Sequence, residues 1–280
     1  MAVQDALALK EQGNKRFAKG DYAGAEGLYS QALRPRASII ADPKDPRLYT
    51  NRAMARVKLQ RWDDAVADCQ ACLALSPDNM KALFQMAQAQ VELRDFDGAL
   101  ENALRAHGIA ARTEDKSLTA VTQLVLRCKK ERWDDRERAR LRQGSELERE
   151  VLALLAREAE QAVADCDEGD EGARADARAE WDAKLATMRT TFELARGEQG
   201  RRRAVPDWAI DDITFGIMVD PVMTKTGKSY ERASILEHLR RSKTDPVTRD
   251  RLDVSDLRPN LDLREACAEF LEENGWAVDW

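Results

Sequence analysis

One pattern of apolar and small residues occurs three times in the first 111 residues. The segments "GDYAGAEGLYSQAL", "QRWDDAVADCQACL" and "RDFDGALENALRAH" each place an aromatic residue three positions before an alanine, with a second small residue seven positions further on. The last two copies are 34 residues apart, whereas the first two are 40 apart because of the loop-like insertion "RPRASIIADPKDP". Helical spacing with small residues at fixed positions predicts stacked pairs of closely packed helices.

The period of 34 residues resembles the tetratricopeptide repeat (TPR), a helix pair that stacks into a solenoid. We therefore predict three TPR repeats over residues 6–111. The small residues Gly13, Ala53 and Ala87 fill the corresponding position of each first helix. The positions that define the second helices are Tyr22, Trp62 and Phe96, then Ala25, Ala65 and Ala99, then Ala32, Cys72 and Ala106.

From about Leu118 the pattern changes to a long, highly charged helix with a narrow apolar stripe. Residues Leu147, Val151, Leu154 and Leu155 lie on one helical face, "DCDEGDEGA" interrupts the pattern, and Trp181, Leu185, Met188 and Phe192 continue it. This predicts an antiparallel helical hairpin over residues 112–200, followed by the linker "RGEQGRRRAVPD". This apolar stripe is too narrow to form an independent core. We therefore expect the hairpin to form a coiled-coil homodimer with another copy of the chain.

The last segment, residues 206–280, mixes short strand and helix signals. "DPVMTKTGKSYE" predicts a hairpin that turns at Thr226 and Gly227, followed by the helix "SILEHLRR" and a loop from Thr244 to Asn260. A final amphipathic helix, "LREACAEFLEENGW", turns Leu263, Cys267, Phe270 and Leu271 inward. The expected fold is mainly α: a TPR solenoid, a helical hairpin and a small α+β domain.

Composition and charge limit the classes of partner. The 280 residues suffice for two or three domains, and 45 Lys and Arg against 51 Asp and Glu give a net charge of -6. We therefore expect no nucleic-acid partner, and the interleaved acids around "RERARLRQ" favour a solvated helix face there. No apolar run is long enough to span a membrane, so we expect no membrane partner and a cytoplasmic or nuclear location. Five scattered cysteines are typical of free thiols in a reducing compartment.

Metal and cofactor sites have little support in the sequence. Cys69 and Cys72 have the spacing of a ligand pair, but they occupy core-facing repeat positions and no second pair completes a zinc site. We interpret both as packing residues. His107 and Cys128 are lone residues on helical patterns, for which core or surface roles are expected. No cofactor or metal is predicted.

The first helices of the three repeats suggest a binding groove. Lys10 and Asn14 are four residues apart and share a helix face, Asn51 lies on the first helix of repeat two, and Lys81 opens repeat three. With "LKEQGN", "YTNRA" and "NMKALF", they resemble the dicarboxylate-clamp TPR domains. That resemblance implies a grip on chaperone tails that end in Glu-Glu-Val-Asp, with Lys58 and Phe84 assisting. Gln85 departs from the pattern, because many clamps carry an arginine there.

The segments "ITFGIMVDPV", "SYERASILEHL", "DPVTR" and "PNLDLREA" closely resemble the U-box, a zinc-free relative of the RING domain. Only His238 and Cys267 could bind metal here, whereas a RING needs two sites of four ligands. We therefore expect hydrogen bonds and ion pairs to hold the loops. The residues expected to take part are Glu231, Arg232, Asp245 and Arg249.

TPR repeats, a helical hairpin and a U-box together resemble the family of chaperone-associated ubiquitin ligases. The resemblance implies that the U-box docks a ubiquitin-conjugating enzyme that carries ubiquitin as a thioester and holds it in a reactive pose. At the matching positions Ile213, Phe215 and Pro246 form the apolar platform, Thr248 lies at its rim, and Arg249 bridges the conjugating enzyme and ubiquitin. Met218 and Leu236 are interpreted as core. A structural role for Arg249 through Asp245 is the alternative.

The same resemblance implies a set of partners. These are heat-shock chaperones of the seventy- and ninety-kilodalton classes, a ubiquitin-conjugating enzyme, ubiquitin, misfolded client proteins and a second copy of the chain. A non-enzymatic co-chaperone adaptor that only slows chaperone cycling remains an alternative function, because the TPR segment fits both.

Overall fold

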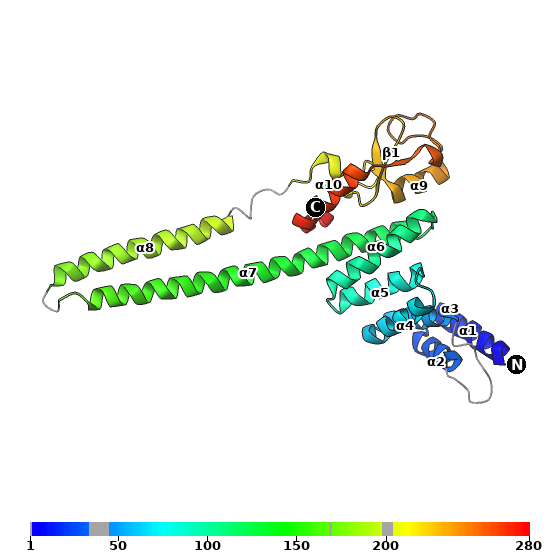
Figure 1. Cartoon of the computed structure of the whole chain (residues 1–280), viewed down its shortest axis with the longest axis horizontal. Coiled ribbons are helices and arrows are strands. Elements are labelled where there is room, and N and C mark those ends of the chain that lie inside the picture. The colour runs from blue at the N-terminus through cyan, green and yellow to red at the C-terminus, as the bar shows by residue number, and fades with distance from the viewer. Residues whose placement is uncertain (1, 34–44, 168–169, 198–203) are drawn as a thin grey trace. The chain divides into compact units, whose positions relative to one another are not determined.

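The computed structural model describes residues 2–33, 45–167, 170–197 and 204–280. The chain divides into two compact units, one made of residues 1–133 and 207–280 and the other of residues 134–206. The expected class is confirmed: helices dominate and one small sheet lies near the carboxyl terminus (Figure 1). The helices are α1 Ala2–Ala18, α2 Tyr22–Leu33, α3 Pro46–Lys58, α4 Trp62–Leu75, α5 Met80–Glu92, α6 Phe96–Arg112, α7 Leu118–Ala164, α8 Glu171–Gly197, α9 Arg232–Arg241 and α10 Leu261–Glu273.

Helices α1 to α6 form the three predicted pairs. The small residues of the repeat are buried, and a Cβ atom on Gly13 would lie 2.5 Å from the ring of Tyr29. Such close approach explains why a glycine stands at this position of α1. The turns between paired helices also repeat, because Gly20, Gln60 and Arg94 all have left-handed backbone angles, with φ of 81°, 58° and 63°. The insertion between repeats one and two lies largely outside the described residues.

Cys69 and Cys72 are fully buried in the core of repeat two, where they pack with Ala53 and Ala82. Burial raises the pKa of both thiols, that of Cys72 to about 11. Such thiols stay protonated and are poor metal ligands and nucleophiles. The packing interpretation is confirmed. Within the described residues no group of three or more His, Cys, Asp or Glu is arranged to hold a metal ion.

Helix α7 begins at Leu118, as expected, but its first four turns belong to the first compact unit. Residues of this part complete two apolar clusters with α5 and α6; they are Leu118, Val121, Leu124, Val125 and Cys128. The unit boundary falls between Trp133 and Asp134. The expected hairpin start at residue 112 therefore differs from the compact-unit boundary, because α7 continues unbroken while one of its faces is still packed.

The second unit contains the rest of α7 and the whole of α8, which runs in the opposite direction (Figure 1). Its predicted apolar residues are only half-buried, and Leu147 and Leu154 are each 56% exposed. Among the side chains described in this unit, only that of Val205, at 9% exposure, is buried. Parts of the acidic break and of the linker lie outside the described residues. No described helix is both long and apolar enough to cross a membrane.

Residues 206–280 form a three-stranded antiparallel sheet in the order β2-β1-β3, with α9 and α10. The strands are β1 Pro221–Met223, β2 Ser229–Glu231 and β3 Arg258–Pro259. The hairpin turn is confirmed, since Gly227 has φ of 82° and its N–H donates to the carbonyl of Thr224. The expectation of a plain loop from Thr244 to Asn260 was incomplete, because it contains β3 and the short 3-10 helix Val254–Asp256. Met218 and Leu236 are core residues, as expected.

Candidate functional sites

The predicted peptide groove begins at Lys10 on α1, whose Nζ atom lies 3.4 Å from Oδ2 of Asp45. Asp45 caps the start of α3 and also accepts hydrogen bonds from the backbone and side chain of Arg47. Although partial burial opposes the effect, these bonds and the charge of Lys10 hold the pKa of Asp45 below its ordinary value. Lys10 thus faces an ionised carboxylate, which any bound carboxylate must displace or join. No sequence pattern pointed to Asp45.

Asn14 and Asn51, predicted on separate repeats, are in direct contact. Oδ1 of Asn14 accepts from Nδ2 of Asn51 at 3.0 Å and from the hydroxyl of Tyr29 at 2.8 Å. Both bonds fix the orientation of the Asn14 amide, so its own NH2 group is left as a donor on the surface. Tyr29, a core residue of the repeat pattern, therefore also positions the groove.

Lys81, Phe84 and Gln85 lie on α5. Lys81 is exposed. Hydrogen bonds from Ser117 lower the pKa of Asp115, which precedes α7, and the charge of Lys81 adds to this effect. Phe84 is half-buried against the two clusters that α5, α6 and α7 share, so only part of its ring can face a ligand. Gln85 is 6% exposed, and its Oε1 atom has no hydrogen-bond partner within the described residues. Lys58, in the last turn of α3, is exposed.

A second candidate site consists of two loops with the same backbone construction. In the first loop, Asp211 is fully buried and its Oδ2 accepts from the backbone N–H of Thr214 at 3.0 Å and from the Thr214 hydroxyl at 2.7 Å. The carbonyl of Asp211 accepts from the N–H of Phe215, and its N–H donates to the carbonyl of Gly216, each at 2.8 Å. Phe215 has φ of 58°, a left-handed conformation uncommon outside glycine.

The loop "DPVTRD" repeats this construction. Oδ1 of the buried Asp245 accepts from the N–H groups of Val247 at 2.9 Å and Thr248 at 3.1 Å. The carbonyl of Asp245 accepts from the N–H of Arg249 at 3.0 Å, and its N–H donates to the carbonyl of Asp250 at 2.8 Å. Arg249 has φ of 68° and therefore corresponds to Phe215. An isolated antiparallel bridge closes each loop: Ile210 with Ile217, and Thr244 with Arg251.

Strand β2 connects the two loops. The hydroxyl of Tyr230 donates to Oδ1 of Asp245 at 2.8 Å, while the backbone N–H of Glu231 donates to Oδ1 of Asp211 at 3.0 Å. Hydrogen bonds to two buried aspartates thus do the work that zinc ions would do in a RING. Of the residues expected to hold the loops, Asp245 does so directly. Asp211 and Tyr230 were missed, although the shared spacing of "DDITF" and "DPVTR" was a readable signal.

Two more of the expected residues, Glu231 and Arg232, hold the segment before β1. Oε2 of Glu231 accepts from the N–H groups of Val219 at 2.7 Å and Asp220 at 2.9 Å, and Arg232 pairs with Asp220 at 2.6 Å. Oε1 of Glu231 is buried and has no partner within the described residues. Burial raises the pKa of the Glu231 carboxyl to about 7, because the charged form is desolvated.

The side chains predicted to dock a conjugating enzyme differ in exposure. Phe215 is 71% exposed, a large apolar ring that the loop holds away from the core. Thr248 and Arg249 are exposed, and Pro246 is half-buried. The Arg249 guanidinium makes no hydrogen bond or ion pair with any described residue. Its only bond to Asp245 is through the backbone, so the structural alternative for this side chain finds no support in the geometry.

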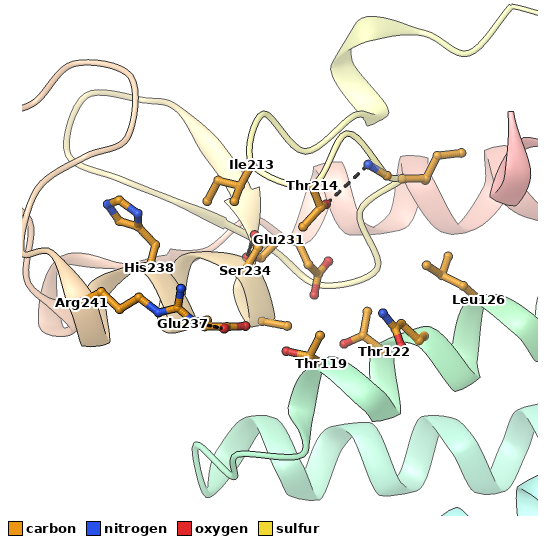
Figure 2. A pocket seen from close by; sticks show the side chains of 14 residues that line it. Thr119, Thr122, Leu126, Ile213, Thr214, Glu231, Ser234, Glu237, His238 and Arg241 are labelled. Atoms are coloured by element: carbon orange, nitrogen blue, oxygen red, sulfur yellow. Dashed lines mark hydrogen bonds and ion pairs between the residues drawn. The ribbon is translucent and has the colours of Figure 1, made fainter.

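Ile213 lies deeper, at the edge of a cavity of about 430 Å³ that faces α7. Figure 2 shows Ile213 and Thr214 on the loop side of this cavity, with Thr119, Thr122 and Leu126 on α7 opposite them. Ile213 also packs against the core of the C-terminal sheet. Of these two residues of the predicted platform, Ile213 is therefore the less accessible, and Phe215 supplies the exposed apolar surface.

Comparisons with known proteins agree with this division of the chain. A family model described as a U-box domain matches residues 205–276. The E3 ubiquitin-protein ligase CHIP of Arabidopsis thaliana is 29% identical over 280 residues, which cover 98% of this chain and 97% of that protein. Tetratricopeptide repeat protein 12 of Mus musculus is 35% identical over 122 residues, 44% of this chain but only 16% of that protein.

Among solved structures, the first TPR of Spaghetti (RPAP3) bound to the HSP90 peptide SRMEEVD is 31% identical. It covers 43% of this chain and 92% of that chain, with a TM-score of 0.37. The carboxyl-terminal residues of our chain thus form a U-box, and the chain is similar over almost its whole length to a ubiquitin ligase.

Proposed function

We propose that this chain, which belongs to the family of CHIP-type E3 ubiquitin-protein ligases, is a chaperone-dependent ubiquitin-protein ligase. Its U-box recruits and activates a ubiquitin-charged conjugating enzyme, and its TPR groove binds the Glu-Glu-Val-Asp tails of heat-shock chaperones. The clients are misfolded proteins held by those chaperones. The ligase itself forms no covalent intermediate.

The observation that carries the proposal is the pair of loops that displays Phe215 and Arg249. A fold gains nothing from an aromatic ring that is 71% exposed, so the loop at Asp211 is best understood as a docking surface. Arg249 lies at the equivalent position of the second loop with its guanidinium available. A planar cation with several donors suits a bridge between carbonyl groups of two partners.

The chemistry belongs to the conjugating enzyme and the client. A client lysine amine attacks the carbonyl carbon of the ubiquitin thioester, the C–S bond breaks, and the cysteine of the conjugating enzyme leaves as a thiolate. The amine nitrogen loses a proton as the amide forms, and the thiolate or solvent takes it up. The ligase lowers the barrier by restricting the motion of ubiquitin, so that the thioester spends more time in a reactive orientation. Phe215 and Pro246 dock the conjugating enzyme, and Arg249 holds the reactive pose.

Client delivery depends on the groove of the TPR repeats. Lys10, Asn14 and Asn51 offer one ammonium and two amide groups on adjacent first helices, and Lys81 offers a second ammonium. Each charge-assisted hydrogen bond to a peptide carboxylate contributes about 1.5 to 3 kcal/mol. Chaperones of the seventy- and ninety-kilodalton classes that end in a carboxylate-rich tail are the proposed ligands.

The hairpin of α7 and α8 is the proposed dimer contact. Its apolar residues remain half-buried or exposed in a single chain, and a second copy would cover them. Light scattering at micromolar concentration should give twice the chain mass. The proposed location is the cytoplasm or the nucleus, where the chaperones and free thiols would be found.

The test is a reconstituted reaction with a client bound to a seventy-kilodalton chaperone, a conjugating enzyme and ubiquitin. We expect client ubiquitination with the wild-type chain and its loss in Lys10→Ala and Lys81→Ala, which should no longer bind the tail peptide in calorimetry. Lys15→Ala changes an exposed lysine of the same helix; it is the control and should behave as wild type. A chain that binds the tail but never transfers ubiquitin would be a non-enzymatic co-chaperone, and the proposal would fail.

A further inference from the structure

A second cavity, of about 740 Å³, lies between α6 and the U-box, within the first compact unit. Four arginines line it, two from α6 and two from the U-box helices: Arg105, Arg112, Arg232 and Arg264. Two aspartates also line it, Asp78 and Asp220. Four cations against two anions leave the cavity with an excess of positive charge, although the chain as a whole is acidic.

The charges of these arginines are not all compensated. Arg232 pairs with Asp220 at 2.6 Å, and Arg105 donates to the carbonyl of Pro77 at 3.3 Å. Arg112 and Arg264 are exposed and make no side-chain hydrogen bond or ion pair with the described residues. Two guanidinium groups from separate elements are thus free to bind an anion in this cavity.

A buried histidine in the same cavity lacks a partner. His107 is only 7% exposed, and its Nε2 atom has no hydrogen-bond partner within the described residues. Burial lowers the pKa of His107; Asp220 opposes this effect, and Arg232 and Arg264 add to it. A polar atom buried without a partner is costly, and a ligand oxygen could accept a hydrogen bond from this ring.

We propose that this cavity binds a soluble anion with two or more phosphate groups, held by Arg112, Arg264 and the His107 ring. Several guanidinium groups around one space favour phosphate over a single carboxylate, because each can donate two parallel hydrogen bonds to phosphate oxygens. The volume exceeds the need of one phosphate and lies in the range of small-molecule sites. Such an anion would link the third TPR repeat to the U-box.

The site is distinct from the proposed chaperone groove and does not depend on it. Lys10 and Lys81, the two cations of the groove, are absent from the cavity wall. Binding of the phosphate probe should therefore be unaffected by Lys81→Ala and by an excess of a peptide ending in Glu-Glu-Val-Asp. Competition with this peptide would show that the probe only occupies the clamp, and the proposal would be wrong.

The test is calorimetry of the full chain with inositol hexakisphosphate, and with pyrophosphate as a smaller probe. We expect the double variant Arg112→Gln, Arg264→Gln to weaken binding by roughly tenfold or more, because two charge-assisted contacts are lost. The matched control is Arg157→Gln, Arg178→Gln, which removes two exposed arginines from α7 and α8 and should bind normally. Equal loss in both double variants would reveal unspecific attraction of polyanions and overturn the site.

An independent readout comes from the imidazoles, because the chain has only two histidines. In NMR titrations the probe should raise the pKa of His107 and leave the ring chemical shifts of His238, which bonds to the carbonyl of Thr244, unchanged. An unchanged His107 titration would contradict the proposal. Sedimentation with phosphatidylcholine vesicles, with and without phosphatidylinositol 4-phosphate, tests the lipid source: capture by the phosphorylated vesicles without binding of soluble probe would also overturn it.

Discussion

The loop at Asp211 and the loop at Asp245 share their hydrogen-bond pattern and their threonine. In both, the fifth residue counted from the aspartate has a left-handed backbone conformation, yet the two loops display opposite chemistry. One presents an exposed aromatic ring at Phe215, and the other presents a charged guanidinium at Arg249. In both loops, the carboxylate of a buried aspartate accepts hydrogen bonds from backbone N–H groups and so holds the loop without zinc ligands. The side chain of the fifth residue makes no hydrogen bond within its loop and is therefore free to contact a partner.

The comparison separates the residues that build the U-box from those that act on partners. Replacing an aspartate should unfold its loop, whereas replacing the fifth residue should leave the loop intact and remove one function. Strand β2 is the common element, since Tyr230 and Glu231 bond to the two aspartates. The following predictions test this separation, from the largest expected effect to the smallest.

The largest effect is expected for Asp245→Ala. The change leaves the Tyr230 hydroxyl and the N–H groups of Val247 and Thr248 without their acceptor, and each unsatisfied buried group costs about 1 to 3 kcal/mol. We expect the free energy of unfolding in urea to fall by about 3 kcal/mol or more. Asp250→Ala, an exposed acid in the same loop, should change little.

Asp211→Ala should have an effect of similar size, since Asp211 accepts three hydrogen bonds from Thr214 and Glu231. Unequal effects would mean that the two loops are not equivalent in stability despite their geometry. An Asp211→Ala variant as stable as wild type would contradict the assignment of the aspartates as substitutes for zinc.

A pH-dependent effect is expected at Glu231. Its folded pKa of about 7 lies above the ordinary value of 4.5, so the folded chain binds the extra proton between these pH values. Stability from this group is therefore complete below about pH 4.5 and is lost as pH rises through about 7. Glu231→Gln should match wild type in mild acid and be more stable near pH 8, by roughly 2 to 3 kcal/mol.

The measurement is thermal or urea unfolding of both proteins across this pH range. Gln can keep the acceptor for Val219 and Asp220, so the comparison isolates the buried charge. If the free energies of unfolding of the two proteins changed with pH in the same way, burial would not be raising the pKa of the Glu231 carboxyl.

A smaller effect is expected for Phe215→Ala, which should weaken binding of the conjugating enzyme by about 2 kcal/mol, as for a buried aromatic anchor. Because the ring is 71% exposed in the free chain, stability in urea should remain unchanged. Val247→Ala is the matched control, an exposed apolar residue of the other loop. Affinity is measured by titration with the uncharged conjugating enzyme. Normal affinity of Phe215→Ala would remove the docking role from the first loop.

Much of the fold was predictable because its signals are periodic. The 34-residue repeat identified core positions such as Ala25, Ala65 and Ala99, all of which are buried. Strand β3, with two residues, is too short to show a period, and its pairing with β1 depends on tertiary contacts. The boundary between the two compact units at Trp133 could not be predicted from the sequence either, because α7 continues as a helix from a packed region into a solvated one.

The residues that the candidate sites present to a partner were predictable from the sequence. The residues that support them were less predictable. Resemblance to known motifs pointed to Phe215, Arg249 and the groove lysines, whose roles stay predictions until tested. Asp211 was missed because an aspartate before apolar residues looks like an ordinary turn residue; the spacing that it shares with "DPVTR" hints at its role, and its bonds to Thr214 and Glu231 reveal it. Asp45 was missed because its partner Lys10 is 35 residues away.

The most direct test of the account is single-turnover discharge of ubiquitin from a charged conjugating enzyme to free lysine, at saturating ligase. We predict that the wild-type chain accelerates discharge and that Arg249→Ala binds the conjugating enzyme almost normally yet discharges slowly, since only the reactive pose is lost. Discharge by Arg249→Ala at the wild-type rate under saturation would contradict the division of roles between the two loops. Absence of acceleration by the wild-type chain would contradict the ligase function itself.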